Sequence, residues 1–339
     1  IKVFPENCIP TVGSVQGSYI AFMTVNRMCK EKNTTLFLDP CFPVHKQQHR
    51  VIGTAFESFD VYNFRGNKLK DKLESYLKKG NIAGIIYSNP NNPSWICFSE
   101  NELRVIAEMA DKYNAVVMED LAYFGMDFRK DYSIPGVEPY QPTIANYTNN
   151  YIIFLSGSKI FSYAGQRIGM MIISPKLFKT QAPDLKKYYS SDIFGRIVVF
   201  DVIYSLTAGI PHSAQYALLA MLKAANNNTF NFIEIVKEYG EKAKIMKKMF
   251  LDNGFKIVYD MDEDKPLADG FYFTFSYPGF SGKQLLEKLL YYGISVTSLA
   301  ITGSNRQEGV RACVSLVPRT MFPVMEERLK KFREHHPTN

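Results

Sequence analysis

The chain has 339 residues, a length that predicts about two domains rather than one small core. Apolar residues make up 46% of it and charged residues 22%, which is typical of folded globular proteins and excludes a disordered chain. The net charge of +7 is spread along the chain, and no apolar run is long enough to span a membrane, so we expect neither a nucleic-acid nor a membrane partner.

The first half of the chain alternates helical patterns with short apolar runs. Helices are expected over 14–30, 68–79 and 99–113, and Ser99 followed by Glu102 resembles a capping box at the third. Strands are expected at the apolar runs 35–38, 82–87, 115–118, 151–155 and 168–173. Because these runs are apolar at nearly every position, both faces of each strand should be buried. The alternation predicts an α/β fold with a mainly parallel central sheet flanked by helices.

Polar residues follow three of these runs. The run 82–87 is followed by Ser-Asn-Pro-Asn-Asn-Pro, the run 115–118 by Glu119 and Asp120, and the run 151–155 by Ser-Gly-Ser-Lys. In open α/β sheets, ligands bind beyond the carboxyl ends of the strands. The sequence therefore predicts a site that gathers Asn, Asp and Lys side chains at one edge of the sheet.

The pattern changes after residue 228. A long helix is expected over 229–253, because Asn253 and Gly254 form a stop signal. The segments that follow are predicted strands over 255–259, 270–277 and 310–317 and predicted helices over 281–292 and 319–334. We therefore expect a large ligand-binding domain over 1–228 and a smaller α+β carboxy-terminal domain over 229–339, which begins with the connecting helix.

Cysteine and histidine spacing gives no sign of a metal site. The five cysteines include no CxxC pair, and no Cys and His cluster has the spacing of a zinc site. Such cysteine usage fits a reduced compartment, so we expect a cytoplasmic protein. His45 and His49 lie four residues apart, but without an HExxH context they are expected to be ordinary surface histidines.

Several motifs in chain order carry a resemblance to a known family. They are SNPNNPS at 88–94, EDLAY at 119–123, SGSK at 156–159 with Arg167 further on, AGIPHSAQ at 208–215 and GVRACVS at 309–315. Together they resemble the class I/II aminotransferases, which are fold-type I pyridoxal-phosphate enzymes, and the match covers essentially the whole chain. The resemblance implies a pyridoxal-phosphate-dependent transferase that moves an amino group from an amino acid to a 2-oxo acid.

The resemblance implies a role for each residue that matches a motif. Lys159 would form the Schiff base with the cofactor and then move the substrate's α-proton as a general base. Asp120 would pair with the pyridine nitrogen and keep it protonated. Asn92 and Tyr123 would hydrogen-bond the phenolic oxygen of the ring.

Further motif residues are implied to hold the rest of the cofactor. Arg167 would bind the phosphate with its planar guanidinium, and Ser156 and Ser158 would add hydroxyl donors. The segment DPCFP at 39–43 resembles the family's DPxYP segment, so that Phe42 would stack on the ring.

The segment TVGSVQG at 11–17 resembles the family's first phosphate loop. A glycine turn that opens a helix presents free backbone N–H groups to an anion. On this resemblance, Gly13, Ser14 and Val15 would complete the phosphate site.

The resemblance also implies where the substrate binds. Arg311, in the carboxy-terminal motif, would bind the substrate α-carboxylate as a bidentate pair. Arg319 lies nearby in the sequence and is an alternative, but the motif favours Arg311. We expect a neutral or aromatic amino acid as substrate, and the resemblance implies a homodimer with its site at the subunit interface.

The sequence departs from the family pattern in two places. Trp95, the only tryptophan, stands where the family's NPxNPTG loop ends in glycine. The chain also begins shortly before the first phosphate loop and without Met, whereas family members carry a longer upstream region. We therefore expect the natural amino terminus to lie further upstream.

The same scaffold supports other functions. Family members also carry out β-elimination as β-lyases, decarboxylation, racemisation and cyclopropane synthesis, so the fold does not fix the reaction. A ligand-sensing domain of a transcription regulator is a further alternative, which a helix-turn-helix segment upstream would favour. A non-catalytic homologue fits poorly, because the motif residues are all present, namely Asn92, Asp120, Tyr123, Lys159, Arg167 and Arg311.

Overall fold

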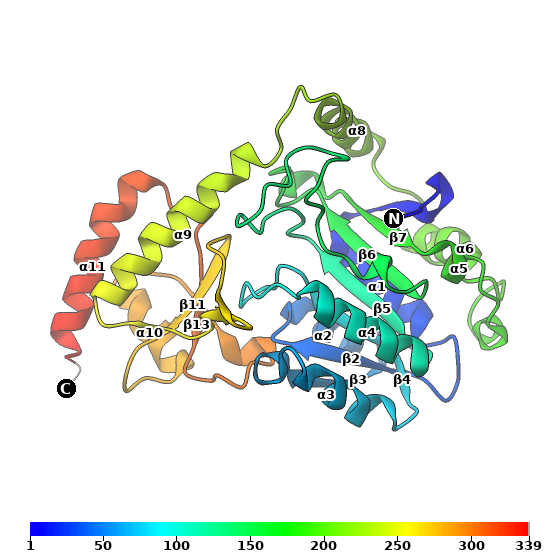
Figure 1. The fold of residues 1–339 in the computed structure, drawn as a ribbon, viewed down its shortest axis with the longest axis horizontal. Coiled ribbons are helices and arrows are strands. Elements are labelled where there is room, and N and C mark those ends of the chain that lie inside the picture. The colour runs from blue at the N-terminus through cyan, green and yellow to red at the C-terminus, as the bar shows by residue number, and fades with distance from the viewer. Residues whose placement is uncertain (338–339) are drawn as a thin grey trace.

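A computed structural model describes residues 1–337 and contains a seven-stranded central sheet (Figure 1). The strands, in the order β1-β7-β6-β5-β4-β2-β3, are β1 (Cys8–Thr11), β7 (Gly169–Ile173), β6 (Tyr151–Ser156), β5 (Val116–Leu121), β4 (Ile82–Ser88), β2 (Thr34–Asp39) and β3 (Ala55–Asp60). Strands β2 to β6 run parallel, whereas β7 is antiparallel to both of its neighbours, β6 and the edge strand β1. The predicted mainly parallel sheet is confirmed.

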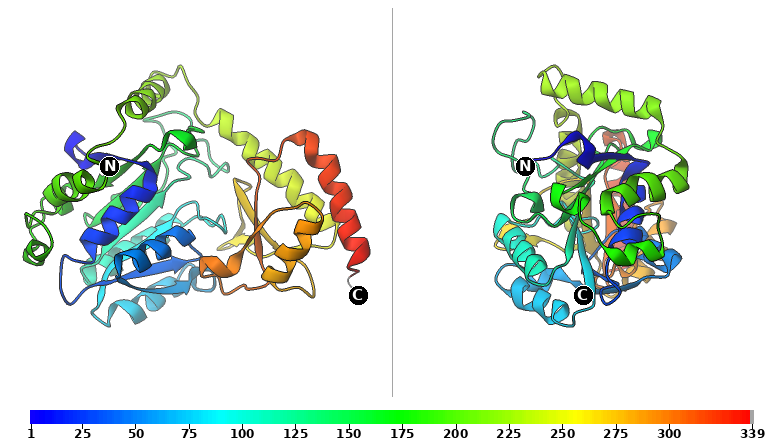
Figure 2. Two further views of the ribbon diagram at one scale, coloured as in Figure 1. Left: turned by 180° about the vertical axis from the view of Figure 1, so that it is seen from behind. Right: turned by 90° about the vertical axis from the view of Figure 1, so that its right-hand side faces the viewer.

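Helices cover both faces of this sheet, so its strands are apolar on both sides. Helices α3 (Lys68–Leu77) and α4 (Glu100–Lys112) pack on the face formed by alternate residues such as Leu36 and Leu38. Helix α1 (Gly13–Val25) packs on the opposite face, which includes Phe37. Figure 1 shows α3 and α4 in front of the sheet, and Figure 2 shows α1 from behind. The expected capping box of Ser99 and Glu102 starts α4.

A smaller four-stranded sheet follows in the sequence. Its strands, in the order β12-β13-β11-β8, are β12 (Thr297–Ser298), β13 (Val310–Cys313), β11 (Tyr272–Ser276) and β8 (Lys256–Ile257). The helices packed with it are α9 (Glu234–Asp252), α10 (Gly282–Tyr291) and α11 (Phe322–His335). This smaller α+β unit lies beside the edge of the large sheet at which the parallel strands end (Figure 2). The proposed boundary at 228/229 stays a prediction.

The remaining elements connect and flank these two sheets. They are α2 (Pro43–Ile52), α5 (Pro175–Phe178), α6 (Phe194–Arg196), α7 (Tyr204–Thr207), α8 (His212–Asn226) and a hairpin of β9 (Met261–Asp262) and β10 (Lys265–Pro266). Within residues 1–337, no helix combines the length and the apolar character needed to cross a membrane.

Several predicted boundaries were wrong: the strand predicted over 310–317 ends at Cys313, and the strand predicted over 115–118 continues to Leu121. The first helix ends at Val25 rather than residue 30, and the predicted strand over 255–259 shrinks to Lys256–Ile257. The helix predicted from 229 begins at Glu234, because Asn231 Oδ1 accepts hydrogen bonds from the backbone N–H groups of Ile233 and Glu234. A side chain that caps these free N–H groups fixes the start of a helix.

Candidate functional site

Three neighbouring parallel strands bring the predicted polar residues to one edge. Asn92 follows β4, Asp120 lies near the end of β5, and Lys159 follows β6. Asp120 is in register with Ser88 on one side and with Phe154 on the other. Because parallel strands end at the same edge of a sheet, the predicted convergence of Asn, Asp and Lys at one edge is observed.

Asp120 is a buried carboxylate. One oxygen accepts a hydrogen bond from the backbone N–H of Ala122 at 3.0 Å, and the other accepts one from the Ser88 hydroxyl at 3.4 Å. Burial raises the pKa of Asp120 to about 6, although both hydrogen bonds act to lower it. A positive group bound beside this carboxylate would favour its charged form.

His45 was expected at the surface, but this prediction was wrong. His45 and His49 are both buried, because they lie on the inner face of α2, a helix that was not predicted. His45 Nε2 lies 3.9 Å from Asp120 Oδ2, and burial lowers the pKa of His45 to about 3. A neutral imidazole therefore lies next to the Asp120 carboxylate. The spacing of His45, Gln48 and His49 was the helical signal that could have revealed it.

Arg311 is the guanidinium that reaches this edge. Its Nη1 donates to Asn92 Oδ1 at 2.8 Å, and its Nη2 donates to Thr297 Oγ1 at 3.3 Å. Its buried Nε has no hydrogen-bond partner among residues 1–337, so a donor remains available. Arg319, in contrast, pairs with Glu238 at 2.6 Å on the surface. The structure brings Arg311 rather than Arg319 to the predicted site.

Lys159 lies in a half-buried, aromatic and cationic environment. Its Nζ is 5.1 Å from the centre of the Phe271 ring. Burial lowers the pKa of Lys159, and the Arg311 and Arg167 guanidinium groups lower it further, while Cys313 acts to raise it. A lysine with a lowered pKa has a larger fraction of neutral amine, which is the nucleophilic and basic form.

The first glycine loop lies against Arg167. Gly13 has a φ of +71°, and a Cβ built on it would lie 2.6 Å from Arg167 Nη2, so only glycine allows this approach. Ser14 and Val15 follow in the first turn of α1, where backbone N–H groups lack partners within the helix. The Arg167 guanidinium donates to Ser158 Oγ at 3.4 Å. These groups form a cradle of donors suited to an anion.

Three predicted residues remain, namely Ser156, Phe42 and Tyr123, and the hydroxyl of Tyr123 donates to that of Tyr272 at 2.9 Å. The Ser156 hydroxyl accepts a hydrogen bond from the backbone N–H of Ser158 at 3.1 Å. Phe42, at the start of α2, packs edge-on against His45 with ring centres 5.4 Å apart. Ser156 and Phe42 therefore belong to the same edge of the sheet as Asp120.

Trp95 forms a wall between the two sheets. It adopts a φ of +67°, an unusual conformation for a residue with a side chain, where the family has glycine. Its ring packs against Tyr123 with centres 5.3 Å apart. A Cβ on Gly270 of the smaller unit would lie 2.0 Å from the indole, so Gly270 makes room for Trp95. Asn92 keeps its contact with Arg311 despite this substitution.

Glu119 is a second buried carboxylate on β5, and its side chain lies on the other face from Asp120. It accepts hydrogen bonds from the hydroxyl of Thr143 at 2.5 Å, the backbone N–H of Ile144 at 3.1 Å and the hydroxyl of Tyr87 at 3.1 Å. Burial still raises the pKa of Glu119 to about 7. Glu119 is therefore a structural carboxylate that favours protonation.

We expect Glu119→Gln to reduce the pH dependence of stability. The folded pKa of about 7 lies above the ordinary 4.5, so wild-type stability should fall as pH rises from about 4.5 to about 7. The free energy of unfolding should fall by an amount on the order of 2–3 kcal/mol, because a tenfold change in proton affinity is worth about 1.4 kcal/mol. Urea unfolding of the apoprotein, followed by Trp95 emission, measures this. A variant with the same pH dependence as wild type would contradict the assignment.

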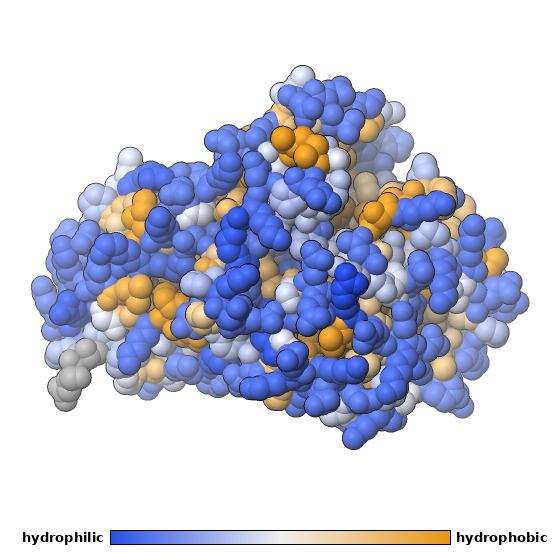
Figure 3. Space-filling view, in the orientation of Figure 1, coloured by the Kyte–Doolittle hydropathy of each residue, from blue (hydrophilic) through white to orange (hydrophobic). Residues whose placement is uncertain are grey.

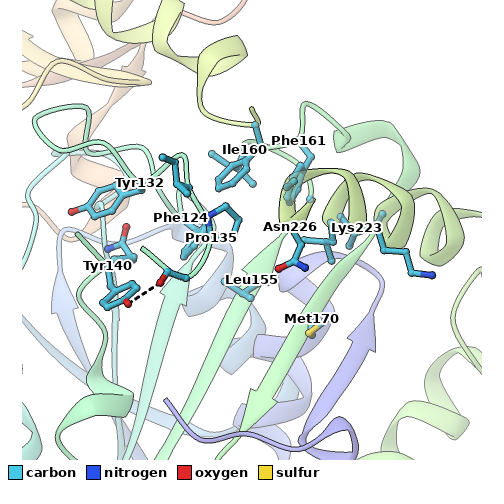
Figure 4. Close-up of a pocket in the computed structure, with 18 of the residues that line it drawn as sticks. Phe124, Tyr132, Pro135, Tyr140, Leu155, Ile160, Phe161, Met170, Lys223 and Asn226 are labelled. Atoms are coloured by element: carbon cyan, nitrogen blue, oxygen red, sulfur yellow. Dashed lines mark hydrogen bonds between the residues drawn. The ribbon is translucent and has the colours of Figure 1, made fainter. Parts of the chain in front are cut away.

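A cavity of about 670 Å³ lies beside the Lys159 loop. Ser156, Gly157 and Ile160 line it, but Lys159 does not. Figure 4 shows Phe124 and Tyr132 on one side, with Phe161 and the α8 residues Lys223 and Asn226 on the other. This apolar cavity adjoins the candidate site and shares Ser156 with it.

Comparisons with known proteins match most of the chain to aminotransferases. The family described as aminotransferase class I and II matches residues 1–325. A probable aspartate aminotransferase of Methanocaldococcus jannaschii is 22% identical over 315 residues, which cover 92% of this chain and 73% of that protein. An aspartate aminotransferase of Pyrococcus horikoshii is 24% identical over 249 residues, which cover 73% of this chain and 56% of that protein.

A solved structure of an aminotransferase from Mycobacterium tuberculosis matches with a TM-score of 0.74 at 17% identity. The match covers 99% of this chain and 78% of that chain. At this identity the likeness shows the fold alone. The chain thus spans only part of the length of each of these relatives.

Proposed function

The chain belongs to the aminotransferase class I and II family, a family of pyridoxal-phosphate enzymes, and we propose that its site transfers an amino group from an amino acid to a 2-oxo acid. One observation carries this proposal. Asp120 and Lys159 meet at one sheet edge, where the Arg311 guanidinium donates to Asn92. Lys159 is a base, Asp120 is an anion that can pair with a cationic ring, and Arg311 is a cation that can bind a substrate carboxylate.

The described residues fit pyridoxal phosphate on three counts. Asp120 is a buried carboxylate with a pKa raised to about 6, which suits a protonated ring nitrogen as partner. Gly13 leaves room for a donor cradle next to Arg167, which suits a phosphate. Lys159 has a lowered pKa, which suits an amine that must react with an aldehyde.

Each residue would hold a different part of the cofactor. Lys159 would bind it covalently as a Schiff base, Asp120 would pair with its ring nitrogen, and Asn92 and Tyr123 would bind its phenolic oxygen. The donors for its phosphate would be Arg167, the Ser156 and Ser158 hydroxyls and the backbone N–H groups of Gly13, Ser14 and Val15. When bound, pyridoxal phosphate supplies an electron sink for negative charge that develops at the substrate α-carbon.

The chain's own residues then bind the substrate and move protons. Arg311 binds the substrate carboxylate, because its guanidinium is held by Asn92 and Thr297 and keeps Nε free. This orients the α-carbon toward Lys159. The neutral amine of Lys159 would take the α-proton and hand it on, and its lowered pKa raises the fraction of neutral amine.

We also propose that the protein is a homodimer with its site at the interface. Apolar and aromatic side chains are exposed in and before α8, namely Phe200, Tyr204, Tyr216, Leu219 and Leu222. Figure 3 shows a mostly hydrophilic face with hydrophobic patches, one of them near the top of the view, where Figure 1 places α8. Exposed apolar patches of this kind suit a subunit interface. A cytoplasmic location is proposed because all five cysteines are free thiols.

Trp95 offers a direct test of cofactor binding. It is the only tryptophan and packs against Tyr123, so its emission reports on the proposed site. Titration of the protein with pyridoxal phosphate should quench this emission to saturation, and borohydride should then fix the cofactor on Lys159, as peptide mass spectrometry would show. A folded protein whose emission does not change, or whose cofactor is fixed on another lysine, would overturn the proposal.

A further inference from the structure

Tyr272 of the smaller sheet lies between two groups of the proposed site. We propose that Tyr272 is a positioning residue for the reaction, which orients Tyr123 through its hydroxyl and Arg311 through its ring. This inference rests on the proposed function. No sequence motif pointed to Tyr272.

The pairing of two strands places Tyr272 next to Arg311. Strands β11 and β13 are antiparallel, with Thr274 opposite Arg311 and Tyr272 opposite Cys313. Tyr272 and Arg311 are therefore diagonal neighbours on one face of the sheet, a distance that long side chains bridge. The Arg311 guanidinium carbon lies 4.2 Å from the centre of the Tyr272 ring.

The Tyr272 ring completes the support of the guanidinium. Asn92 and Thr297 bind the two terminal nitrogens of Arg311, which fixes the direction of its plane. The aromatic face then attracts the cation from one side, and this attraction is stronger where water is excluded. Tyr272 is buried, and Trp95 packs against its ring with centres 6.1 Å apart. The Tyr272 ring is thus held in place by Trp95 of the larger unit, and in that position it supports Arg311.

The Tyr272 hydroxyl is paired with that of Tyr123. Tyr123 donates to Tyr272 at 2.9 Å, and both side chains are buried. A phenol donates one hydrogen bond and accepts others, so either hydroxyl of the pair can be the donor to the other. When Tyr123 turns its proton toward an acceptor in the site, Tyr272 can donate to Tyr123 in return. Such a chain of hydrogen bonds strengthens the donation from Tyr123.

The two roles belong to different parts of one side chain, so two variants separate them. Tyr272→Phe keeps the ring and removes the hydroxyl, whereas Tyr272→Met removes both at similar volume. The first readout is the pH midpoint of the absorbance band of the bound cofactor. The second is the Kd of 3-phenylpropionate, an unreactive carboxylate, measured by Trp95 emission. Tyr239→Phe is the matched control, because Tyr239 packs behind Phe271 rather than on Arg311.

Tyr272→Phe should raise the pH midpoint of the band by about half a pH unit, because Tyr123 becomes a weaker donor. Its Kd for 3-phenylpropionate should stay within about twofold of wild type, while Tyr272→Met should raise that Kd about fivefold. Recovery of carboxylate binding in Tyr272→Phe relative to Tyr272→Met assigns that effect to the ring. Tyr239→Phe should change neither readout.

An unchanged pH midpoint in Tyr272→Phe would overturn the role of the hydroxyl. Wild-type carboxylate binding in Tyr272→Met would overturn the role of the ring, and Tyr272→Leu replaces this variant if it does not fold. A wild-type protein that does not bind the cofactor would instead contradict the proposed function, so the two failures are distinguishable.

Discussion

Replacement of Lys159 with alanine should lower the rate of amino transfer by at least about 10³-fold, because a positioned base alone contributes up to about 10⁴-fold. The half-buried Lys159 amine has a lowered pKa and follows β6 at the edge that holds Asp120. Loss of the amine removes both covalent attachment and proton transfer. The measurement is the steady-state rate with saturating cofactor.

Two variants make this test specific. Lys159→Arg keeps a positive charge but has no neutral amine at accessible pH, so it should be as inactive as the alanine variant. Lys179→Ala changes a lysine of the same unit that lies outside the proposed site and should keep the wild-type rate. Activity within about tenfold of wild type in either Lys159 variant would show that another residue moves the proton.

Asp120→Asn should lower the rate by about 10²–10³-fold while substrate affinity changes much less. The amide has the same shape but cannot compensate a positive ring nitrogen. The apoprotein should become more stable at neutral pH. Burial raises the pKa of Asp120 from 3.8 to about 6, so the wild-type carboxylate costs stability increasingly as pH rises through that interval.

This combination separates a catalytic role from a structural one. Rates and urea unfolding should be measured on the same preparation, at about pH 5 and about pH 7. An inactive variant with higher stability at the upper pH supports the assignment. A variant that loses stability and activity together would indicate that Asp120 holds the fold instead.

The edge of the sheet could be predicted because its signals are local. Each buried strand contains a continuous apolar run, and the polar residues at or just beyond the ends of β4, β5 and β6 are adjacent in the sequence to those runs. Parallel pairing then brings Asn92, Asp120 and Lys159 together without further information.

The rest of the site depends on tertiary contacts. Spacing alone could not exclude Arg319, whereas the structure pairs it with Glu238 at the surface. Tyr272 reaches Arg311 only through the register of β11 and β13. His45 was misjudged because its helical spacing indicates a helix but not what covers its inner face, and the packing of α2 against Phe22 is a tertiary contact.

Transfer of an isotopic label between two substrates tests amino transfer by this protein most directly. The protein with pyridoxal phosphate is incubated with isotopically labelled neutral, aromatic and acidic amino acids and with a 2-oxo acid, and products are identified by mass spectrometry. We expect the label to appear in the amino acid derived from the 2-oxo acid, only when both substrates are present and not with Lys159→Ala. Release of the label as ammonia, or loss of carbon dioxide, would contradict amino transfer in favour of a β-lyase or a decarboxylase. Saturable amino-acid binding with no product would instead favour a ligand-sensing domain.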